Sequence, residues 1–181
     1  MKRIIVIGSC GAGKSTFSKK LHAITDLELI HLDRHYWKPH WTETPKAEWE
    51  STVKALIAKD SWIIDGNYGG TMDIRIERAD TIIFLAYSRL TCMYRVLSRV
   101  IKNYGRTRDD LGKDCPEKVD WQFLHYVWNF KKTREPGILN KLEKVKPTKK
   151  VYIFENDGQS LNFINELRSS RESAAQLNKD K

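Results

Sequence analysis

Gly8-Ser9-Cys10-Gly11-Ala12-Gly13-Lys14-Ser15 is the stretch of this sequence that decides its fold. It fits an eight-position pattern of glycine, any four residues, glycine, lysine and then serine or threonine, which forms a phosphate-binding loop when it connects a strand to a helix. That context is present, because residues 3–7 are an apolar run typical of a buried strand, and apolar residues recur at helical spacing after Lys14. The sequence therefore predicts a phosphate-binding loop followed by a helix that ends near Ala23.

Glycines and the helix start give this loop its chemistry. Glycine lets the backbone wrap so that several N–H groups point inward, and the partial positive charge of the helix N-terminus also attracts an anion. Lys14 would reach the β- and γ-phosphates of ATP, and the Ser15 hydroxyl would bind Mg²⁺. The residues predicted to bind ATP are Gly8, Ser9, Cys10, Gly11, Ala12, Gly13, Lys14, Ser15 and Thr16. The alternative, a glycine-rich turn without a ligand, is disfavoured by the complete pattern in its required context.

Further short apolar runs alternate with helical patterns along the chain. Strands are predicted at residues 27–31, 62–64, 81–86 and 149–154, and helices at 45–59, 88–102, 117–133, 160–168 and after Pro136. Thr44 is the expected cap and Pro45 the first residue of the helix that ends near Lys59. This alternation predicts an α/β fold in which helices cover both faces of a parallel sheet.

The predicted helix at 88–102 carries both apolar and basic residues. Its buried side is expected to consist of Leu90, Met93, Leu97, Val100 and Ile101. The segment that follows, residues 103–116, contains two glycines, a proline and charges of both signs, which is typical of an exposed, mobile segment. We expect this segment to act as a lid.

Length and composition indicate one soluble domain. A chain of 181 residues suits one core, and 40% hydrophobic and 30% charged residues are ordinary proportions for a soluble protein. We expect a single domain over residues 1–168, with a substrate-side segment at 33–60 and a lid region at 103–134. The polar tail at 169–181 is expected to be disordered.

Charge and targeting signals narrow the class further. The net charge of +9, from 32 Lys and Arg against 23 Asp and Glu, favours an anionic ligand such as ATP, a phosphorylated substrate or nucleic acid. The three cysteines lack paired spacing and predict neither a zinc site nor a disulfide framework. The apolar run after Arg3 is shorter than the roughly 7 to 15 residues of a signal-peptide core, and no stretch approaches the about 20 apolar residues of a membrane span. The expected location is the cytoplasm.

Two carboxylates, Asp33 and Asp65, follow predicted strands. In a doubly wound sheet, ligands bind beyond the carboxyl ends of the strands, which is where both side chains fall. Phosphoryl transfer needs a carboxylate to position Mg²⁺, and it can use another to accept the proton of an attacking hydroxyl. We predict that Ser15 and Asp65 position Mg²⁺, and that Asp33 orients or deprotonates the acceptor. The alternative is that each aspartate only caps a turn.

Basic residues beyond the sheet are candidates for charge stabilisation. Arg95, Arg99 and Lys102 lie at helical spacing opposite the predicted apolar stripe, and Arg106 and Arg108 follow in the lid segment. Arginine pairs bidentately with phosphate oxygens, so Arg99, Arg106 and Arg108 are predicted to neutralise the charge that develops on the transferred group. A solvated basic helix face is the alternative.

Aromatic residues and histidines surround Asp33. Tyr36, Trp37 and Trp41 form either a stacking surface for a planar substrate group or ordinary packing. The histidines at 31, 35 and 40 would need a helix to pair on a metal, and Pro39 argues against one. Satisfied or exposed histidines are therefore favoured over a metal site.

Together these residues resemble the adenylate kinase-like group of small kinases and, more closely, the family of DNA topology modulation proteins. The closer resemblance covers about residues 1–168 and rests on His31-Leu32-Asp33 with Trp37, Pro39 and Trp41, on Asp65-Gly66-Asn67-Tyr68, and on Gly105-Arg106-Thr107-Arg108, Asp110-Leu111-Gly112 and Cys115-Pro116-Glu117. The resemblance to adenylate kinases implies a P-loop NTPase fold of three α/β/α layers, with a five-stranded parallel sheet in the order 2-3-1-4-5 and a helical lid after the fourth strand. It also implies that Arg95 and Arg99 approach the adenine and phosphates of ATP, and that residues 156–161 border the adenine.

Two departures from adenylate kinases bear on the acceptor and the lid. Asn67-Tyr68 follows Asp65-Gly66 where those kinases have Phe-Pro-Arg, so an arginine that grips the monophosphate is missing and AMP is placed in doubt as acceptor. The lid has only Cys115, which excludes the zinc-bearing lid of some such kinases.

The predicted function is an ATP- and Mg²⁺-dependent phosphotransferase that moves the γ-phosphoryl group to a small, unidentified hydroxyl or phosphate acceptor. The alternative is a nucleotide-gated DNA-binding or regulatory protein that affects DNA topology. The net charge of +9 favours this alternative, because positive charge attracts the phosphate backbone of DNA. The sequence contains no recognition-helix motif, and its charge is spread along the chain. A third reading is slow ATP hydrolysis as a switch. No membrane partner is expected, and the sequence leaves the oligomeric state open.

Overall fold

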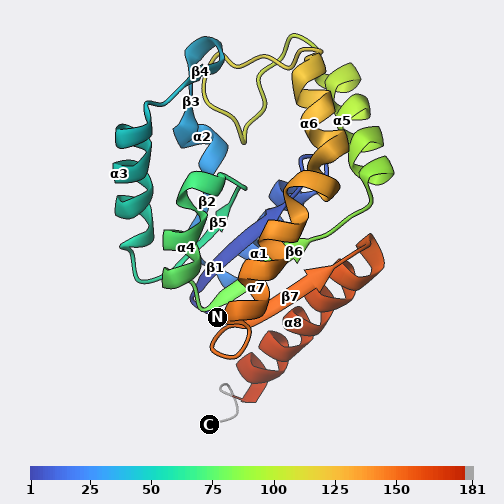
Figure 1. Ribbon diagram of the computed structural model, residues 1–181. Helices are drawn as coiled ribbons and strands as arrows, with labels where there is room; N and C mark the ends of the chain where they lie inside the picture. Colours follow the sequence, from blue (N-terminus) through green and yellow to red (C-terminus); the bar gives the residue numbers. More distant parts are fainter. Residues whose placement is uncertain (178–181) are drawn as a thin grey trace.

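A five-stranded parallel sheet lies at the centre of the molecule in the computed structural model, which describes residues 1–177 (Figure 1). Its strands are β1 (Arg3–Gly8), β2 (Leu29–His31), β5 (Trp62–Asp65), β6 (Thr81–Leu85) and β7 (Lys150–Phe154), in the spatial order β2-β5-β1-β6-β7. A separate antiparallel hairpin consists of β3 (Trp37–Lys38) and β4 (Thr42–Glu43). When the sheet strands are counted without this hairpin, their order is 2-3-1-4-5, so the predicted fold class is confirmed.

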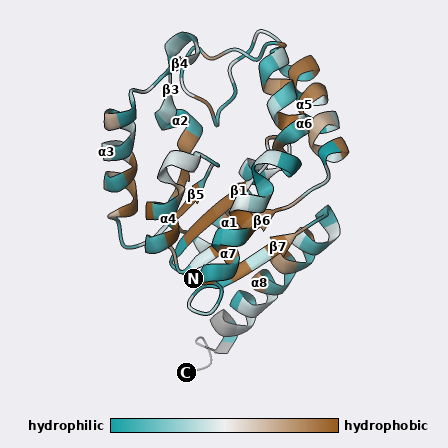
Figure 2. Ribbon diagram, in the orientation of Figure 1, coloured by the Kyte–Doolittle hydropathy of each residue, from teal (hydrophilic) through white to brown (hydrophobic). Residues whose placement is uncertain are grey.

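Helices cover both faces of this sheet. Ile5 and Ile7 of β1 lie in one hydrophobic core and Ile4 and Val6 in the other, because successive side chains of a strand point to opposite faces. The helices on the first core are α3 (Lys46–Ile57), α4 (Met72–Arg78) and α7 (Glu135–Val145); those on the second are α1 (Lys14–Thr25), α5 (Arg89–Asn103) and α8 (Asp157–Leu177); α6 (Trp121–Thr133) reaches both. Figure 2 shows β1, β5 and β6 as mainly hydrophobic between helices of mixed hydropathy, as expected for strands buried on both faces.

Strand register brings the predicted site residues to one edge of the sheet. Because the strands are parallel, their carboxyl ends lie together: Asp65 at the end of β5 is paired with His31 of β2 and with Val6 of β1. Asp33 follows in the short helix α2 (Leu32–Tyr36), which the apolar pattern did not predict. The phosphate loop and both aspartates therefore share this edge.

Two predicted helix ends differ from the structure. Thr44 does not cap α3: its hydroxyl donates a hydrogen bond to the Tyr36 carbonyl over 2.6 Å, and the N-cap position is Pro45. The last helix, α8, continues to Leu177, where the sequence predicted a disordered tail from residue 169. The remainder of that predicted tail, 178–181, lies outside the described residues. Among residues 1–177, no helix has the length and apolar character that crossing a membrane requires.

The predicted buried side of α5 was wrong in most of its residues. Cys92, Val96 and Val100 face the core, whereas Leu90, Leu97 and Ile101 are exposed. Apolar residues occur on two sides of this helix, and spacing alone does not tell which side meets the sheet.

The lid segment, residues 103–116, packs against the hairpin formed by β3 and β4. The His40 N–H donates to the Asp114 carbonyl over 2.9 Å, and the Trp41 indole N–H donates to the Pro116 carbonyl over 3.0 Å. Leu111 and Cys115 of the segment are buried rather than exposed. Residues 103–116 therefore lie against the β3–β4 hairpin at the top of the molecule in Figure 1.

Gly112→Ala tests this contact, because an added Cβ would lie 2.0 Å from the Trp37 carbonyl oxygen. We expect the substitution to force lid and hairpin apart and to lower the free energy of unfolding by about 1–3 kcal/mol, the usual cost of overpacking. Thermal or denaturant unfolding measures this. The control is Gly137→Ala, since nothing lies within 4 Å of a Cβ there. Equal stability of Gly112→Ala and wild type would contradict tight packing between lid and hairpin.

Candidate active site

The phosphate loop leaves the start of α1 open to an anion. α1 begins at Lys14, its N-cap Gly13 provides no side-chain hydrogen bond, and its first turn contains no acidic residue. The first N–H groups of a helix have no partner inside the helix, so here they stay available to phosphate oxygens. The Lys14 ammonium donates to the Ser9 carbonyl over 3.1 Å, which holds the lysine at the loop.

Two glycines of the loop are required by backbone geometry. Gly11 has φ +81° and a Cβ there would lie 2.3 Å from the Cys92 carbonyl oxygen of α5. Gly8 has φ +149°, with the Leu85 carbonyl oxygen 2.6 Å from the corresponding position. Both positions favour glycine for its conformation and its size. The loop therefore fits closely between β6 and α5.

A cavity of about 360 Å³ lies on one side of the loop, between α1, α5 and α8. Its lining includes Ala12, Gly13, Thr16, Phe17, Tyr87, Arg95, Asp157, Ser160 and Leu161. The Arg95 guanidinium carbon lies 5.2 Å from the centre of the Tyr87 ring, and an Arg95 nitrogen lies 2.5 Å from an Asp157 carboxylate oxygen. A planar cation and apolar side chains beside a phosphate loop suit a nucleotide base.

A larger cleft of about 1070 Å³ lies on the other side of the loop. The aromatic residues that line it are Tyr36, Trp37, Trp41, Tyr68, Phe123 and Tyr126. The basic residues that line it are Lys14, Arg99, Arg108, Lys118, Arg134 and Lys141. An aromatic surface that shares a cleft with Lys14 suits a small molecule bound next to the phosphates.

Asp33 lines this cleft and is held by Tyr68, whose hydroxyl donates to an Asp33 carboxylate oxygen over 2.5 Å. Burial raises the pKa of Asp33 above its ordinary value, while the Tyr68 hydrogen bond and the positive charge of Lys14 act in the opposite direction. The negative charges of Asp65 and Asp110 raise this pKa further. A carboxylate of raised pKa in a substrate-sized cleft is suited to accept a proton.

Asp65 forms a buried pair with His31. The His31 Nδ1 atom lies 2.9 and 3.0 Å from the two Asp65 carboxylate oxygens, and both side chains are about 6% exposed. Parallel pairing of β2 with β5 places these residues side by side. Asp65 is thereby fixed in orientation at the edge of the sheet, and it lines neither cavity.

Asp110, in the lid segment, is a carboxylate that the sequence analysis did not assign to the site. Burial raises the pKa of Asp110, but Arg108, a hydrogen bond with Ser15 and further nearby groups together outweigh it, so this pKa lies below its ordinary value. This carboxylate therefore stays charged next to the serine predicted to bind Mg²⁺. Asp110 follows no strand, and the only sequence signal for it was the Asp110-Leu111-Gly112 motif of the family resemblance.

Ser15 and Asp110 share a hydrogen bond and are oxygen donors of the kind that Mg²⁺ prefers. Asp65, the other carboxylate predicted to bind Mg²⁺, has both oxygens close to His31. Within residues 1–177, no group of three or more His, Cys, Asp or Glu side chains could hold a metal ion. Mg²⁺ is usually bound through one or two carboxylates together with substrate phosphates, and the residues present fit that mode.

Arg99 and Arg108 are both paired with the buried carboxylate of Glu117. One Glu117 oxygen lies 2.9 Å from the Arg99 Nε atom and 3.2 Å from the Arg108 Nε atom. Burial and the neighbouring charge of Arg108 lower the pKa of Arg99. Glu117 thus brings an arginine of α5 and an arginine of the lid together at the cleft.

Glu117→Gln is expected to destabilise the protein without nucleotide, because Arg99 would lose its carboxylate partner and Arg108 would keep only Asp110. Removing one partner of a buried ion pair costs about 3 kcal/mol. ATP should restore part of this loss, since its phosphates supply negative charge. Thermal unfolding with and without ATP measures both effects. Glu143→Gln is the control, since the Glu143–Lys146 pair is more than 60% exposed. A Glu117→Gln variant as stable as wild type would contradict the structural importance of this pair.

Arg75 fixes the loop that carries Asn67 and Tyr68. Its side chain is fully buried and donates to the carbonyls of Gly66, Asn67, Tyr68 and Thr71 over 2.8 to 3.3 Å. Burial lowers the pKa of Arg75 to about 10. Four backbone carbonyls held by one side chain give Tyr68, and through it Asp33, a defined position.

The structure brings most of the predicted residues together but not all. Lys14, Asp33, Arg99 and Arg108 share the larger cleft with Cys10, whereas Arg95 lies in the smaller cavity. Arg106 is exposed and lines neither cavity. Residues of the site that sequence reasoning missed are Tyr68, Arg75, Asp110 and Glu117. Three of these four residues occur in motifs of the family resemblance: Tyr68 in Asp65-Gly66-Asn67-Tyr68, and Asp110 and Glu117 in the motifs of residues 105–117. The sequence analysis assigned none of the three a role in the site.

The fold is similar to that of known small-molecule kinases. The shikimate kinase of Acinetobacter baumannii, solved in complex with shikimate, is 14% identical, with 96% of this chain and 94% of that chain covered and a TM-score of 0.56. The shikimate kinase of Bacteroides thetaiotaomicron is 18% identical, with 94% and 98% covered and a TM-score of 0.53. No protein-family model and no curated protein matches this sequence. At these identities the likeness shows a P-loop kinase fold alone.

Proposed function

We propose that the protein is an ATP- and Mg²⁺-dependent phosphotransferase that moves the γ-phosphoryl group of ATP to a hydroxyl group of a small acceptor. The observation that carries this proposal is that Lys14 of the phosphate loop and the Asp33 carboxylate line one cleft, on the opposite side of the loop from the cavity suited to the base. Phosphoryl transfer needs a cation at the γ-phosphate and a proton acceptor at the attacking hydroxyl, close to each other in one cleft.

In this proposal, the two cavities have separate tasks. The smaller cavity takes the adenine, with Arg95 and Tyr87 against it, and the phosphates lie on the N–H groups of the loop. Ser15 and Asp65, with Asp110, would hold Mg²⁺, which supplies charge neutralisation at the β- and γ-phosphates. The acceptor lies against the aromatic side of the larger cleft.

The transfer itself uses residues of the larger cleft. The acceptor oxygen forms a bond to the γ-phosphorus as the bond to the oxygen bridging the β- and γ-phosphates breaks, and ADP leaves. Asp33 takes the proton of the acceptor hydroxyl. Lys14, Arg99 and Arg108 stabilise the negative charge on the transferred group. To do so, Arg99 and Arg108 must give up part of their ion pairs with Glu117 and bind phosphate oxygens instead.

Further support comes from relatives in fold and from motifs. Two shikimate kinases share the fold, and one was solved in complex with shikimate. The motifs around Asp33, Asp65 and Asp110 support placing the chain with the DNA topology modulation proteins, as a single cytoplasmic domain over residues 1–168. Segments 33–60 and 103–134 would serve as the acceptor side and the lid.

The experiment is ATP turnover with Mg²⁺, with and without a panel of nucleosides, nucleotides and small hydroxylated metabolites, following the γ-phosphate by mass. Label transfer to a hydroxyl acceptor supports the proposal and names the substrate class. Tight ATP binding without transfer to any acceptor contradicts it and favours a switch or a nucleotide-gated DNA-binding protein.

A further inference from the structure

The part of the larger cleft next to the β3–β4 hairpin combines aromatic rings with a carboxylate. Tyr36, Trp37 and Trp41 line the cleft there, together with Glu43 of β4. In the hairpin register Trp37 is paired with Glu43, so these two side chains leave the same face of the hairpin. Lys38, the residue after Trp37, belongs to the opposite face. We call Tyr36, Trp37, Trp41 and Glu43 the hairpin corner.

The rings of the hairpin corner stand at steep angles to one another. Tyr36 and Trp37 meet at 85° with ring centres 5.0 Å apart, and Trp37 and Trp41 meet at 73° with ring centres 5.3 Å apart. The Trp41 indole N–H donates to the Pro116 carbonyl, and the Trp41 backbone has a left-handed conformation with φ +60°. A bulky residue adopts this conformation only where its surroundings hold it there. The rings therefore form angled walls rather than one flat stacking surface.

Angled aromatic walls beside a carboxylate suit a positively charged group. The face of an aromatic ring carries partial negative charge, so several rings around one point attract an ammonium group. Burial raises the pKa of Tyr36, and a hydrogen bond with Glu43 and the negative charge of Glu43 raise it further. The Glu43 carboxylate therefore lies against this ring. Among residues 1–177, Glu43 takes part in no ion pair, so its charge is available to a ligand.

Most other charged groups of the larger cleft are engaged elsewhere. The basic residues that line it are Lys14, Arg99, Arg108, Lys118, Arg134 and Lys141, and the acidic ones are Asp33, Glu43, Glu117 and Asp120. Lys14 lies at the phosphate loop, and Arg99 and Arg108 are paired with Glu117. Lys141 is paired with Asp73. These four cations are therefore held at the phosphate loop, at Glu117 or at α4.

The remaining charges leave the hairpin end of the cleft negative. Arg134 ends α6, about 21 Å along the helix axis from Asp120 at its start. Lys118, which is exposed, and Asp120 carry opposite charges close together in the chain. Glu43 is then the charge without a counterpart at this end. The basic residues and the histidine of the neighbouring segments that do not line the cleft are Arg34, Lys38, His40, Lys46 and Lys113.

We propose that the acceptor carries an ammonium group, which the hairpin corner binds, in the same molecule as the hydroxyl that receives the phosphoryl group. This proposal rests on the proposed phosphotransferase function, and it names amino alcohols and amino sugars as the acceptor class. Tyr68 connects the two ends of such a molecule: its hydroxyl binds Asp33, and its ring lies 4.6 Å from the Tyr36 ring, centre to centre. One small molecule can therefore reach both the rings and the base.

Binding of matched compounds of different charge tests this proposal without requiring turnover. With Mg²⁺ and ADP present, calorimetric titration compares choline with its neutral isostere, in which carbon replaces the ammonium nitrogen, and glucosamine with glucose and glucuronate. We expect each ammonium compound to bind about 5- to 30-fold more tightly than its neutral counterpart, as cation–π contacts allow. Glucuronate should bind most weakly of the three sugars, because Glu43 repels it.

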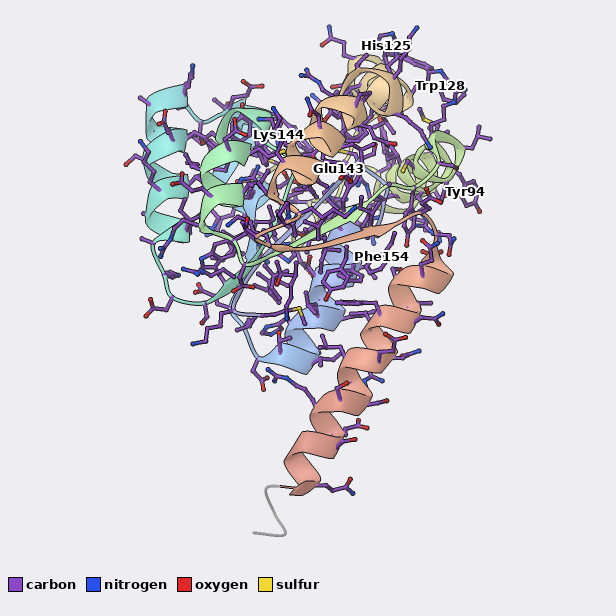
Figure 3. The ribbon with its side chains drawn as sticks, turned by 60° about the horizontal axis from the view of Figure 1, so that its bottom comes forward. Tyr94, His125, Trp128, Glu143, Lys144 and Phe154 are labelled. Carbon is purple, nitrogen blue, oxygen red and sulfur yellow. The ribbon has the colours of Figure 1, made fainter. Side chains whose placement is uncertain are left out.

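Trp41→Leu and Glu43→Gln should each remove most of this preference for the ammonium compound. Neither residue lines the smaller cavity, so both variants should keep the ADP affinity of wild type. Trp128→Leu and Glu143→Gln are the matched controls and should keep the preference, since neither residue lines a cavity. In Figure 3, Trp128 points outward from the edge of the molecule that α5 and α6 form.

Equal binding of choline and its neutral isostere overturns the proposal, and so does a preference that both Trp41→Leu and Glu43→Gln leave intact. Tighter binding of glucuronate than of glucosamine overturns it in favour of an anionic acceptor. Failure of the phosphotransferase function would look different. Phosphoryl transfer to a neutral or anionic acceptor alone supports that function and overturns the ammonium class, whereas ammonium binding without transfer to any acceptor supports the hairpin corner as an ammonium site and contradicts the phosphotransferase.

Discussion

Lys14→Ala is expected to abolish phosphoryl transfer almost completely while the protein stays folded. Lys14 is the cation of the phosphate loop, and its ammonium group is already held at the loop by the Ser9 carbonyl. Negative charge on the phosphoryl oxygens increases in the transition state, so a preorganised cation there stabilises the transition state more than bound ATP. Loss of one such group lowers kcat by about 10²- to 10³-fold.

The measurement is kcat and KM for the acceptor identified with wild type, together with the thermal unfolding of each variant. The control is Lys19→Ala, which removes an exposed lysine from the same helix and should leave kcat unchanged. If Lys14→Ala turned over at the wild-type rate, the phosphate loop would not be the site of transfer.

Asp33→Asn is expected to lower kcat by about 10²- to 10⁴-fold, the usual contribution of a general base. The amide keeps the size and the Tyr68 contact of the carboxylate, but it accepts no proton. Asp60→Asn, at an exposed turn, is the control. An unchanged kcat in Asp33→Asn would contradict the role of Asp33 as general base and would favour the alternative that it only caps a turn.

The pH profile gives a second, independent test of Asp33. Because burial raises the pKa of Asp33, the base is protonated at higher pH than an ordinary aspartate, and kcat/KM should fall as the pH is lowered through that pKa. The Tyr68 hydrogen bond lowers this pKa, so Tyr68→Phe should raise it and move the acid limb of the profile to higher pH. A limb that stays in place, or moves to lower pH, would contradict the assignment.

The sequence predicts those features of the structure whose residues are close together in the chain. The phosphate loop was predictable because its glycines, lysine and flanking strand and helix are consecutive. Asp33 and Asp65 were placed at one edge because parallel strands align their carboxyl ends. The strand order came from the resemblance to adenylate kinases and is the order observed.

Features that depend on distant contacts escaped sequence reasoning. Glu117 meets Arg99 and Arg108 through the folding of the lid, and no spacing in the sequence joins the three. The covered side of α5 was misassigned because both sides carry apolar residues. Arg75 reads as an ordinary surface arginine of a short helix, yet its side chain is fully buried.

The two cavities on either side of the phosphate loop have no lining residue in common within the described chain. The smaller cavity is lined mainly by α1, α5 and α8. The larger cleft is lined mainly by the β3–β4 hairpin, the loop after β5, residues 108–120 and α6, and Lys14 of α1 and Arg99 of α5 also reach it. Substitutions in the larger cleft away from Lys14 can therefore accumulate while the smaller cavity keeps its shape. Under the proposed function, such a division would make the protein evolvable, because new acceptors could be selected one substitution at a time in a chain that keeps its phosphoryl donor.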